Sequence, residues 1–298
     1  MPELPEVETV CRALKPHLAG SRILDVAALA GRLRGPLDTE QLREFCAGRT
    51  ILDVRRRAKY IIVELGPAHS PSAKKAANRK SPIEKSAAPR RALLLHLGMT
   101  GAFRVCGEDT PMEKHLRVFW TLDGRRQWRM LDARKFGSVE CRGLRADGSV
   151  VELDHLGVEP LEGGFTAGFL LGKMCARRCP VKCLLMDQAV VAGIGNIYAS
   201  EACFRAGVRP QRPAARVTRP EAVRLVRECR AVLREAIASG GSTIRSFSGV
   251  DGSEGHFSVA LKVYGRAGEP CLRCGGAHTV RKLILGGRSS FYCPACQK

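Results

Sequence analysis

The sequence predicts an α+β protein with a β-rich N-terminal half, a helical second half and a small cysteine-rich module at its C-terminal end. Three observations support this fold class: short β-type runs fill the chain to about residue 150, helical periodicity begins after about residue 160, and four cysteines lie in the last 30 residues. Strands that precede helices along the chain are typical of α+β folds. The 298 residues are enough for two domains, at least one of them with a large core.

The chain begins with a predicted amphipathic helix over residues 3–19. Its apolar side chains recur at intervals of three and four residues, and three glutamates stand in its first turns, where carboxylates oppose the positive end of the helix dipole. The apolar positions are Val7, Val10, Cys11, Leu14 and Leu18, and the glutamates are Glu3, Glu6 and Glu8.

Short β-type runs follow this helix as far as about residue 150. Turn signals separate some of them, namely Asp123-Gly124 and Asp147-Gly148. The pattern predicts a β-sandwich or a small barrel. The predicted strands cover Ile51–Val54, Tyr60–Leu65, Leu93–Leu97, Leu116–Leu122 and Ser138–Cys141.

The segment 66–92 differs sharply in composition from the strands around it. It is rich in Ser, Pro and Ala and carries seven basic residues and one acidic residue, a local charge of +6. A core cannot form from such a composition, so we expect a flexible, basic insertion between two strands. A solvated loop is the plain interpretation, and an electrostatic tether to nucleic acid is the alternative.

Helical patterns dominate after residue 160. Thr218 and Glu221 have the spacing of a capping box, and an apolar face continues beyond them to Ile237. A second helix is expected over residues 197–206, ending at Gly207. The five glycines in residues 239–256 predict a loop.

The net charge of +20 arises from 49 Lys and Arg against 29 Asp and Glu, and it favours a polyanionic partner such as DNA or RNA. Apolar runs stay far short of the roughly 20 residues that a membrane-spanning helix needs, so we expect no membrane association. The first eight residues are acidic, whereas a signal peptide begins with basic residues. We therefore expect a cytoplasmic protein whose 13 cysteines are mostly reduced.

Two cysteine pairs near the C-terminal end, Cys271 with Cys274 and Cys293 with Cys296, have the spacing of a four-thiolate zinc site. The 18 residues between the pairs leave room for a hairpin. Four sulfur ligands complete a tetrahedral ion, so we expect one structural Zn²⁺ without an open position for catalysis. Such a site contributes roughly 10 kcal/mol or more to the folding of a small module.

Three further cysteines, Cys175, Cys179 and Cys183, stand four residues apart. On one helix this spacing would put three thiols on the same face, but Pro180 disfavours an uninterrupted helix. We expect these side chains to be small buried hydrophobic residues, and a second metal site is the alternative.

The N-terminal Met-Pro-Glu sequence has a possible chemical role. Removal of Met1 would expose the secondary amine of Pro2, and a terminal amine has a reference pKa of about 8, against about 10.4 for lysine. A secondary amine that attacks an aldehyde carbon gives an iminium ion, which eases elimination at the neighbouring carbon, and Glu3 stands next to it as an acid or base. By itself, however, a proline in the first turn of a helix is ordinarily structural.

Six motifs, in one order, closely resemble the bacterial formamidopyrimidine-DNA glycosylase (8-oxoguanine DNA glycosylase) family. They are the N-terminal MPELPEVETV, Arg56–Tyr60 (RRAKY), His96–Met99 (HLGM), Gly193–Glu201 (GIGNIYASE), Val263–Arg266 (VYGR) and the four-cysteine terminus. The resemblance covers nearly the whole chain apart from residues 66–92.

This resemblance implies a particular domain arrangement. It comprises an N-terminal catalytic β-sandwich with flanking helices over residues 1–158, a helix–two-turn–helix DNA-binding domain over 159–262 and a four-cysteine zinc finger over 263–298. Double-stranded DNA that contains oxidised purines or abasic sites would lie in the basic cleft between the domains, bound by a monomer. The predicted loop at 239–256 corresponds to the family's lesion-capping loop.

The resemblance also implies an activity and a set of site residues. The activity is that of a bifunctional DNA glycosylase and abasic-site lyase of base excision repair, with Pro2 as the nucleophile, Glu3 as the acid or base, Glu6 as a support and Lys59 as a cation near the lesion. Met99, Arg134 and Phe136 match residues that fill the gap left by an extruded nucleotide, and we call these three residues the wedge. His96, Asn196, Tyr264 and Arg288 match phosphate-binding positions. His96, between Leu95 and Leu97, equally suits an ordinary strand residue.

Two departures and two alternatives accompany the resemblance. Ala133 and Lys135 stand where the family often has Pro and Arg, and Leu116 follows His115 where it often has Asp. The related endonuclease VIII removes oxidised pyrimidines with a similar Pro-Glu start, but usually has Gly where this chain has Leu4 and lacks the wedge pattern. The other alternative is a non-catalytic zinc-ribbon DNA-binding protein, which would need neither Pro2, Glu3 nor Lys59.

Overall fold

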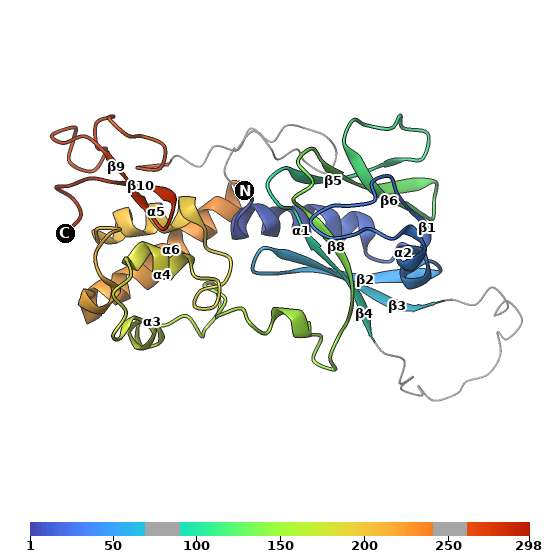
Figure 1. The fold of residues 1–298 in the computed structure, drawn as a ribbon, viewed down its shortest axis with the longest axis horizontal. Coiled ribbons are helices and arrows are strands. Elements are labelled where there is room, and N and C mark those ends of the chain that lie inside the picture. Colours follow the sequence, from blue (N-terminus) through green and yellow to red (C-terminus); the bar gives the residue numbers. More distant parts are fainter. Residues whose placement is uncertain (69–89, 241–260) are drawn as a thin grey trace, which may run out of the picture.

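The computed structural model describes residues 1–68, 90–240 and 261–298 of the chain. Strands and two helices form one end of the long axis, and helices with a small β-hairpin form the other (Figure 1). Most of the predicted insertion at 66–92 and nearly all of the predicted loop at 239–256 lie outside the described residues, so both stay predictions.

The first helix, α1 (Leu4–Leu18), forms where the apolar spacing predicts it, and all five predicted apolar side chains are buried. Glu3 is its N-cap residue, and the N–H group of Glu3 donates to the carboxylate of Glu6 at 2.8 Å. The glutamates of the first turn thus form a capping box. This arrangement fixes the conformation of the chain immediately after Pro2.

Two antiparallel four-stranded sheets make up the β-rich half, within the described residues. Because the strands divide into two separate sheets, this half is a sandwich rather than a barrel. The first sheet has the order β1 (Ile23–Ala28), β6 (Leu116–Leu122), β7 (Arg126–Asp132) and β5 (Gly101–Gly107). The second has the order β2 (Arg49–Arg57), β3 (Tyr60–Ala68), β4 (Arg91–His96) and β8 (Ser138–Gly143).

Three strands and one helix of the sandwich escaped the sequence prediction: β1, β5, β7 and α2 (Thr39–Cys46). Strand β7 contains several charged residues, which obscured its apolar alternation. One of them, Arg129, is fully buried and donates to the carboxylate of Glu113 at 2.7 Å. Helix α2 has only eight residues and is capped by Asp38, whose carboxylate accepts from the backbone N–H groups of Glu40 and Gln41.

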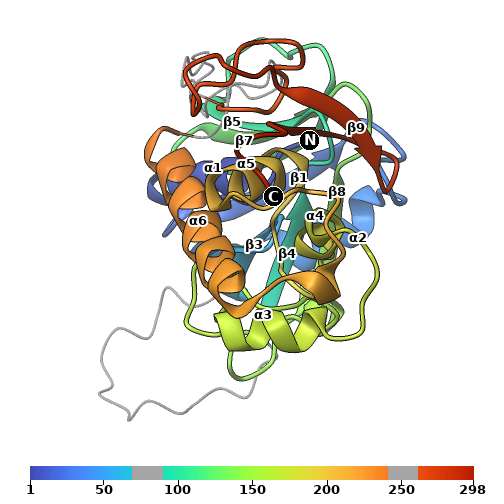
Figure 2. The same ribbon diagram turned by 90° about the vertical axis from the view of Figure 1, so that its left-hand side faces the viewer.

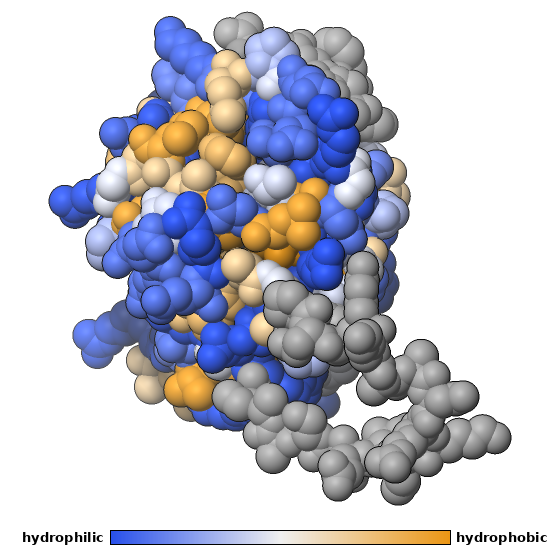
Figure 3. All heavy atoms as spheres, turned by 90° about the vertical axis from the view of Figure 1, so that its right-hand side faces the viewer, coloured by the Kyte–Doolittle hydropathy of each residue, from blue (hydrophilic) through white to orange (hydrophobic). Residues whose placement is uncertain are grey.

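Trp120 and Trp128 lie at the centre of the sandwich core. Both are fully buried, and their rings stack with centroids 4.0 Å apart. The outer surface at this end of the molecule is largely hydrophilic, with hydrophobic residues gathered in separate patches (Figure 3). The core therefore lies between the two sheets and beneath α1 and α2.

The helical half contains α3 (Ala167–Met174), α4 (Val181–Met186), α5 (Asn196–Ala206) and α6 (Arg219–Ala238), with short 3-10 turns η2 (Val151–Leu153) and η3 (Ala214–Arg216). The capping box of Thr218 and Glu221 is present at the start of α6. Helix α5 ends at Gly207, which has a left-handed φ of 71°. Both predicted helix boundaries are therefore confirmed. Among the described residues, no helix combines the length and hydrophobicity required to cross a bilayer.

The prediction that Cys175, Cys179 and Cys183 are buried is wrong. Cys175 is exposed, and the other two are half-buried. They do not lie on one helix, because α3 ends before Cys175 and Pro180 immediately precedes α4. Pro180 therefore interrupts the helix as expected, and the interruption leaves these thiols near the surface.

The C-terminal module is a two-stranded antiparallel hairpin of β9 (Arg281–Leu285) and β10 (Arg288–Tyr292). Its small core includes Val263, Val280 and Phe291, and it packs against Phe204 of α5. The hairpin stands beside α5 and close to the N-terminus of the chain (Figures 1 and 2).

The start of α1 joins the two halves of the molecule. Leu4 belongs to the core of the helical half, whereas Val7 and the later apolar residues of α1 belong to the sandwich core. The N–H group of Leu4 donates to the carbonyl of Gly193 at 3.1 Å. The expected domain limits at 158/159 and 262/263 stay a prediction, but the first turn of α1 clearly contacts both halves.

Candidate active site

The N-terminus of the chain lies at the junction between the sandwich and the helical half (Figures 1 and 2), and Pro2 immediately precedes the turn of α1 that contacts both halves. Pro2 is buried, and Met1 beside it lines a cavity of about 440 Å³. While Met1 is attached, the nitrogen of Pro2 is an amide without nucleophilic character. Removal of Met1 would therefore place a free secondary amine at the edge of this cavity.

Glu3 is held at the N-terminal end of α5. Its carboxylate accepts from the backbone N–H groups of Gly195 at 2.9 Å and Ile197 at 3.0 Å. Helix N-termini bind anions because their first N–H groups lack partners within the helix. Burial nevertheless dominates and raises the pKa of Glu3, although Lys59 and these backbone bonds act in the opposite direction. Glu3 is thus fixed in position and biased toward its protonated form.

Glu6 supports this arrangement from the next turn. One carboxylate oxygen accepts the N–H group of Glu3, and the other accepts the hydroxyl of Tyr198 at 2.6 Å. Tyr198 belongs to α5 and is buried. The predicted support residue therefore links α1 to α5 directly behind Glu3.

Lys59 lies at the turn between β2 and β3 and is also buried. Its ammonium group donates to the carbonyl of Ile194, in the loop before α5, at 3.3 Å. Burial lowers the pKa of Lys59, and the nearby carboxylate of Glu3 opposes this effect. The sandwich and the N-terminal turn thus each contribute one titratable group to the same place.

The 440 Å³ cavity brings together most of the residues predicted for the site. This volume lies within the range of roughly 300–1,000 Å³ that is usual for ligand pockets. Cationic groups line it, and these suit a phosphate-bearing ligand. The predicted residues among its lining are Glu3, Lys59, His96, Met99, Asn196, Tyr264 and Arg288.

A second cavity, of about 370 Å³, lies between α2 and β8. Its lining shares Arg34 with the first cavity but includes none of the predicted site residues. We therefore regard the cavity at the junction as the candidate site.

His96 ends strand β4 and lies in the cavity wall. Its Nδ1 atom accepts the N–H group of Gly98 at 2.9 Å, which assigns the ring proton to Nε2 in the neutral form. Burial lowers the pKa of His96 to about 4, with further contributions from Arg34 and Lys59. The side chain is therefore an uncharged hydrogen-bond donor at neutral pH, and not a cation.

Arg134 and Phe136 lie on an exposed loop that borders a neighbouring cavity together with Met99. The guanidinium of Arg134 stands over the ring of Phe136, 4.8 Å from its centroid. Phe136 is 44% exposed, an unusual position for a large aromatic side chain. The three residues predicted as a wedge thus stand together at the mouth of the site.

Asp132 holds this wedge in place, a role that the sequence analysis missed. Its buried carboxylate accepts the N–H groups of Arg134 at 3.2 Å and Gly137 at 2.8 Å, and it also binds the hydroxyl of Thr100. The loop after β4 and the loop after β7 are therefore joined. An acidic residue immediately before the Arg134 loop was the available signal.

Asn196 is the first residue of α5, one residue before the predicted start of that helix. Its amide group donates to the carbonyl of Ser289 at 3.0 Å and to the hydroxyl of Tyr264 at 3.4 Å. Arg288 belongs to the same hairpin as Ser289 and lines the cavity. The predicted phosphate-binding residues of the second half thus meet where α5 contacts the hairpin.

Lys182 is a further residue of this contact that sequence reasoning missed. It is fully buried and donates to the side chain of Asn196, to the carbonyl of Ser289 at 3.1 Å and to the hydroxyl of Ser290 at 2.7 Å. Burial lowers the pKa of Lys182 to about 8. A lysine that stands between Val181 and an apolar run was the only sequence signal.

Glu201 anchors the C-terminal module from the middle of α5. Its fully buried carboxylate accepts the backbone N–H groups of Lys262, Val263 and Tyr264 at 2.9–3.0 Å. The last residue of the GIGNIYASE motif therefore positions Tyr264. The first part of this motif thus binds Glu3, and its last residue binds the C-terminal module.

The four C-terminal cysteines form a zinc site of the expected kind. The Sγ atoms of Cys271 and Cys296 are 3.9 Å apart, those of Cys274 and Cys293 are 4.0 Å apart, and all four lie within 4.8 Å of one another. Zn–S bonds of about 2.3 Å in a tetrahedral ion require sulfur separations of about 3.8 Å. The donor set therefore fits one structural Zn²⁺.

Comparison with known proteins assigns the family. Models of three families match in sequence order: the formamidopyrimidine-DNA glycosylase N-terminal domain over residues 1–139, the formamidopyrimidine-DNA glycosylase H2TH domain over 156–248, and a zinc finger found in FPG and IleRS over 268–298. The formamidopyrimidine-DNA glycosylase of Laribacter hongkongensis is 43% identical, and the alignment covers 100% of both chains. The chain belongs to the formamidopyrimidine-DNA glycosylase family.

Solved structures of formamidopyrimidine-DNA glycosylases share the fold over nearly the full chain. A point mutant of the Lactococcus lactis FPG, in complex with DNA that contains Fapy-dG, is 30% identical with a TM-score of 0.82 and full coverage of both chains. The MutM (FPG) protein of Thermus thermophilus is 36% identical with a TM-score of 0.78, over 99% of this chain and 98% of that one. The predicted α+β fold and the family resemblance are confirmed.

Proposed function

We propose that this chain is a bifunctional DNA glycosylase and abasic-site lyase of base excision repair. It removes oxidised purines, namely 8-oxoguanine and formamidopyrimidines, from double-stranded DNA. Membership of the formamidopyrimidine-DNA glycosylase family supports the glycosylase activity. The main structural support is the cavity at the junction, where Glu3 and Lys59 meet beside the chain N-terminus.

The proposed chemistry begins at Pro2 after Met1 has been removed. The nitrogen of Pro2 attacks C1′ of the damaged nucleotide, the bond from C1′ to the base breaks, and the base leaves with the electron pair and takes up a proton. Glu3, biased toward its protonated form by burial, donates a proton to the sugar ring oxygen. The ring opens to an iminium ion between Pro2 and C1′.

Strand cleavage follows from the iminium ion by two eliminations. Loss of a proton from C2′ expels the 3′ phosphate, and loss of a further proton from C4′ expels the 5′ phosphate. Hydrolysis of the remaining iminium ion by water releases the sugar fragment as an aldehyde and frees Pro2. Because the iminium nitrogen of a proline carries no hydrogen, it cannot lose its charge by deprotonation, and it therefore withdraws electrons throughout both steps.

The remaining site residues bind the DNA in this proposal. Arg288 grips a phosphate, Asn196, Tyr264 and the neutral His96 donate to phosphate oxygens, and Lys59 stands near the lesion and its phosphate. Met99, Phe136 and Arg134 enter the duplex where the damaged nucleotide has been extruded, with Arg134 facing the orphaned base. The protein acts as a monomer, and the zinc module holds the hairpin that carries Arg288.

Borohydride trapping tests the nucleophile. Protein from which Met1 has been removed is incubated with DNA that contains 8-oxoguanine or an abasic site, in the presence of borohydride, which reduces an iminium ion to a stable amine. We expect a covalent protein–DNA adduct that mass spectrometry maps to Pro2. Protein that retains Met1 is the matched control and should form no adduct. Failure of the correctly trimmed protein to form any adduct would overturn the proposal.

Excision from a panel of lesions separates the proposed substrates from those of endonuclease VIII. Each lesion is placed opposite each of the four bases, and released bases are measured in single-turnover experiments. We expect oxidised purines to be released faster than oxidised pyrimidines. The opposite result would assign the chain the substrate range of endonuclease VIII, and binding without excision would indicate a non-catalytic DNA-binding protein.

A further inference from the structure

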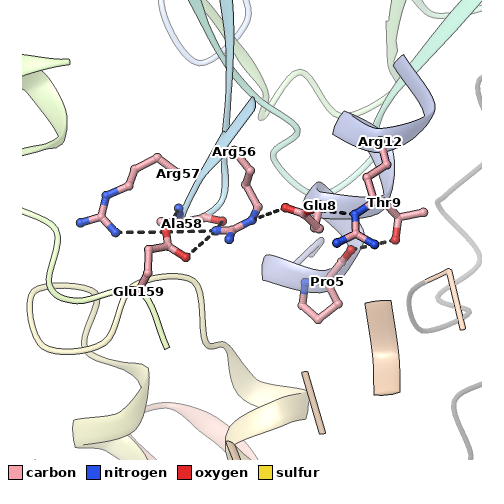
Figure 4. A network of polar contacts seen from close by, with 8 residues as sticks. All are labelled: Pro5, Glu8, Thr9, Arg12, Arg56, Arg57, Ala58 and Glu159. Atoms are coloured by element: carbon pink, nitrogen blue, oxygen red, sulfur yellow. Dashed lines mark hydrogen bonds and ion pairs between the residues drawn. The ribbon is translucent and has the colours of Figure 1, made fainter. Parts of the chain in front are cut away.

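A buried ion network connects α1, the β2–β3 turn and the segment that leads into the helical half. Arg56 lies between two carboxylates and donates to Glu8 at 2.9 Å and to Glu159 at 2.8 Å (Figure 4). Arg57 donates to Glu159 at 3.0 Å. The side chains of Arg56 and Glu159 are 9% and 4% exposed. Removal of one partner from such a buried network leaves an uncompensated charge.

Glu159 also binds the backbone of the turn that carries Lys59. The N–H group of Ala58 donates to the Oε1 atom of Glu159 at 2.6 Å (Figure 4). Ala58 has a left-handed φ of 52°, a conformation that is unfavourable for a residue other than glycine. The charge-assisted bond to Glu159 offsets this cost. Because Lys59 is the next residue, Glu159 fixes the backbone from which its side chain extends.

The segment around Glu159 also positions the acceptor of the Lys59 ammonium group. Gly157 donates to the carbonyl of Gln188 at 2.8 Å, and Ala192 donates to the carbonyl of Val158 at 2.9 Å. This paired loop continues directly to Ile194, whose carbonyl accepts from Lys59. One unit of structure therefore holds Lys59 at its backbone, through Glu159, and at its ammonium group, through Ile194.

We propose that Glu159 is a positioning residue for Lys59 in the excision reaction. The inference rests on the proposed function, because that function places Lys59 at the lesion. Glu159 does not line the cavity, and its carboxylate already accepts from Arg56, Arg57 and Ala58. It acts on the reaction through the turn and makes no contact with the DNA. The same carboxylate ties the sandwich to the start of the helical half.

A double-mutant cycle tests this inference. Single-turnover rates of 8-oxoguanine excision are measured for the trimmed wild-type protein, Glu159→Gln, Lys59→Met and the double variant. We expect Glu159→Gln to slow excision roughly 10- to 100-fold, as for a misplaced catalytic group. In the Lys59→Met background, the same substitution should change the rate less than about 2-fold, since coupled residues do not act additively. An equal fold-change in both backgrounds would overturn the inference.

Glu113→Gln is the matched control. Like Glu159, Glu113 does not line the cavity and accepts from two arginines, at 2.9 Å from Arg104 and 2.7 Å from Arg129. Its arginines, however, belong to β5 and β7 and not to the strand that leads to Lys59. We expect both glutamine variants to lower the melting temperature and Glu113→Gln alone to keep the wild-type excision rate. A loss of excision in Glu113→Gln as large as that in Glu159→Gln would reduce Glu159 to a structural role.

Two further outcomes are distinguishable. If Glu159→Gln fails to fold, Arg57→Met removes one of the same contacts from the other side, and it should show the same dependence on Lys59. Excision that is absent in the wild type would overturn the proposed function itself. Excision that is unchanged in Lys59→Met would leave that function standing but overturn the role of Lys59, and with it the positioning role of Glu159. If Lys59→Met slows excision but Glu159→Gln slows it by the same factor in both backgrounds, only the positioning role would be overturned.

Discussion

At the residue scale, burial shifts three titratable groups of the cavity toward their neutral forms. It raises the pKa of Glu3, lowers that of Lys59 and lowers that of His96 to about 4. A protonated carboxyl group can donate a proton to a sugar oxygen, and an ammonium group with a lowered pKa exchanges protons more readily near neutral pH. The cavity is therefore suited to proton transfer, in addition to binding an anion.

The lowered pKa of His96 makes a prediction about stability in acid. An unfolded histidine gains its proton near pH 6.5, whereas the folded one gains it near pH 4, so the contribution of His96 to stability is present above pH 6.5 and is lost as the pH falls toward 4. Between pH 7 and pH 5, the free energy of unfolding of the wild type should fall by about 2 kcal/mol more than that of His96→Asn. Asparagine keeps an acceptor for Gly98. Urea denaturation at both pH values measures the difference, and equal losses in the two proteins would contradict the prediction.

At the scale of single elements, α5 organises the site. Its first N–H groups hold Glu3, Tyr198 holds Glu6, and Glu201 holds the backbone before the hairpin. The N-cap of α5 is a glycine because the side chain of Glu3 lies directly against it. A Cβ atom on Gly195 would overlap the carboxyl group of Glu3. The conformation of Gly195 is extended and open to any residue, so the restriction is purely steric.

Gly195→Ala should therefore impair the reaction without unfolding the protein. We expect single-turnover excision to fall about 100-fold, because Glu3 must move from the N-terminus of α5. Gly172→Ala is the control: apart from its own stretch of helix, no described atom lies within 4 Å of its added Cβ, and alanine favours the helix α3. That variant should keep its excision rate. Wild-type excision by Gly195→Ala would show that Glu3 does not need this position.

Strongly patterned elements could be predicted from the sequence, and elements stabilised by tertiary contacts could not. The apolar spacing of α1, the capping box of α6 and Gly207 at the end of α5 each encode a local preference, and all three are confirmed. Strand β7 was missed because Arg129, a charged residue, is buried through bonds to Glu113 and to the carbonyls of the loop before β6. The residues proposed for the site came from motifs, whereas Asp132, Lys182, Glu201 and Glu159 act through partners distant in sequence.

At the scale of the whole molecule, three parts of the chain contribute to one cavity: the N-terminal turn, the sandwich and the helices with their hairpin. The hairpin reaches the cavity through Arg288, but its own core is small. Its position depends on the zinc site at one end and on Glu201, Asn196 and Lys182 at the other.

Removal of zinc should accordingly abolish DNA binding while the sandwich stays folded. Small zinc modules unfold without their metal. We expect chelation, or the substitution Cys296→Ser, to release about one zinc ion per chain, to weaken binding to damaged duplex DNA by at least about 100-fold and to expose residues 261–298 to proteases. Cys106→Ser, a half-buried cysteine of β5, is the control. Full DNA affinity in the metal-free protein would contradict the role of the hairpin.

The stacked pair of Trp120 and Trp128 has a consequence for spectroscopy. These are the two tryptophans of the chain, and both lie in the sandwich core. Intrinsic tryptophan emission and the coupled near-ultraviolet dichroism of the two indoles therefore report on the sandwich alone. Loss of zinc, rearrangement of the hairpin and melting of the helical half should leave this signal nearly unchanged, so an optical melting curve would record one part of the molecule and not the protein as a whole.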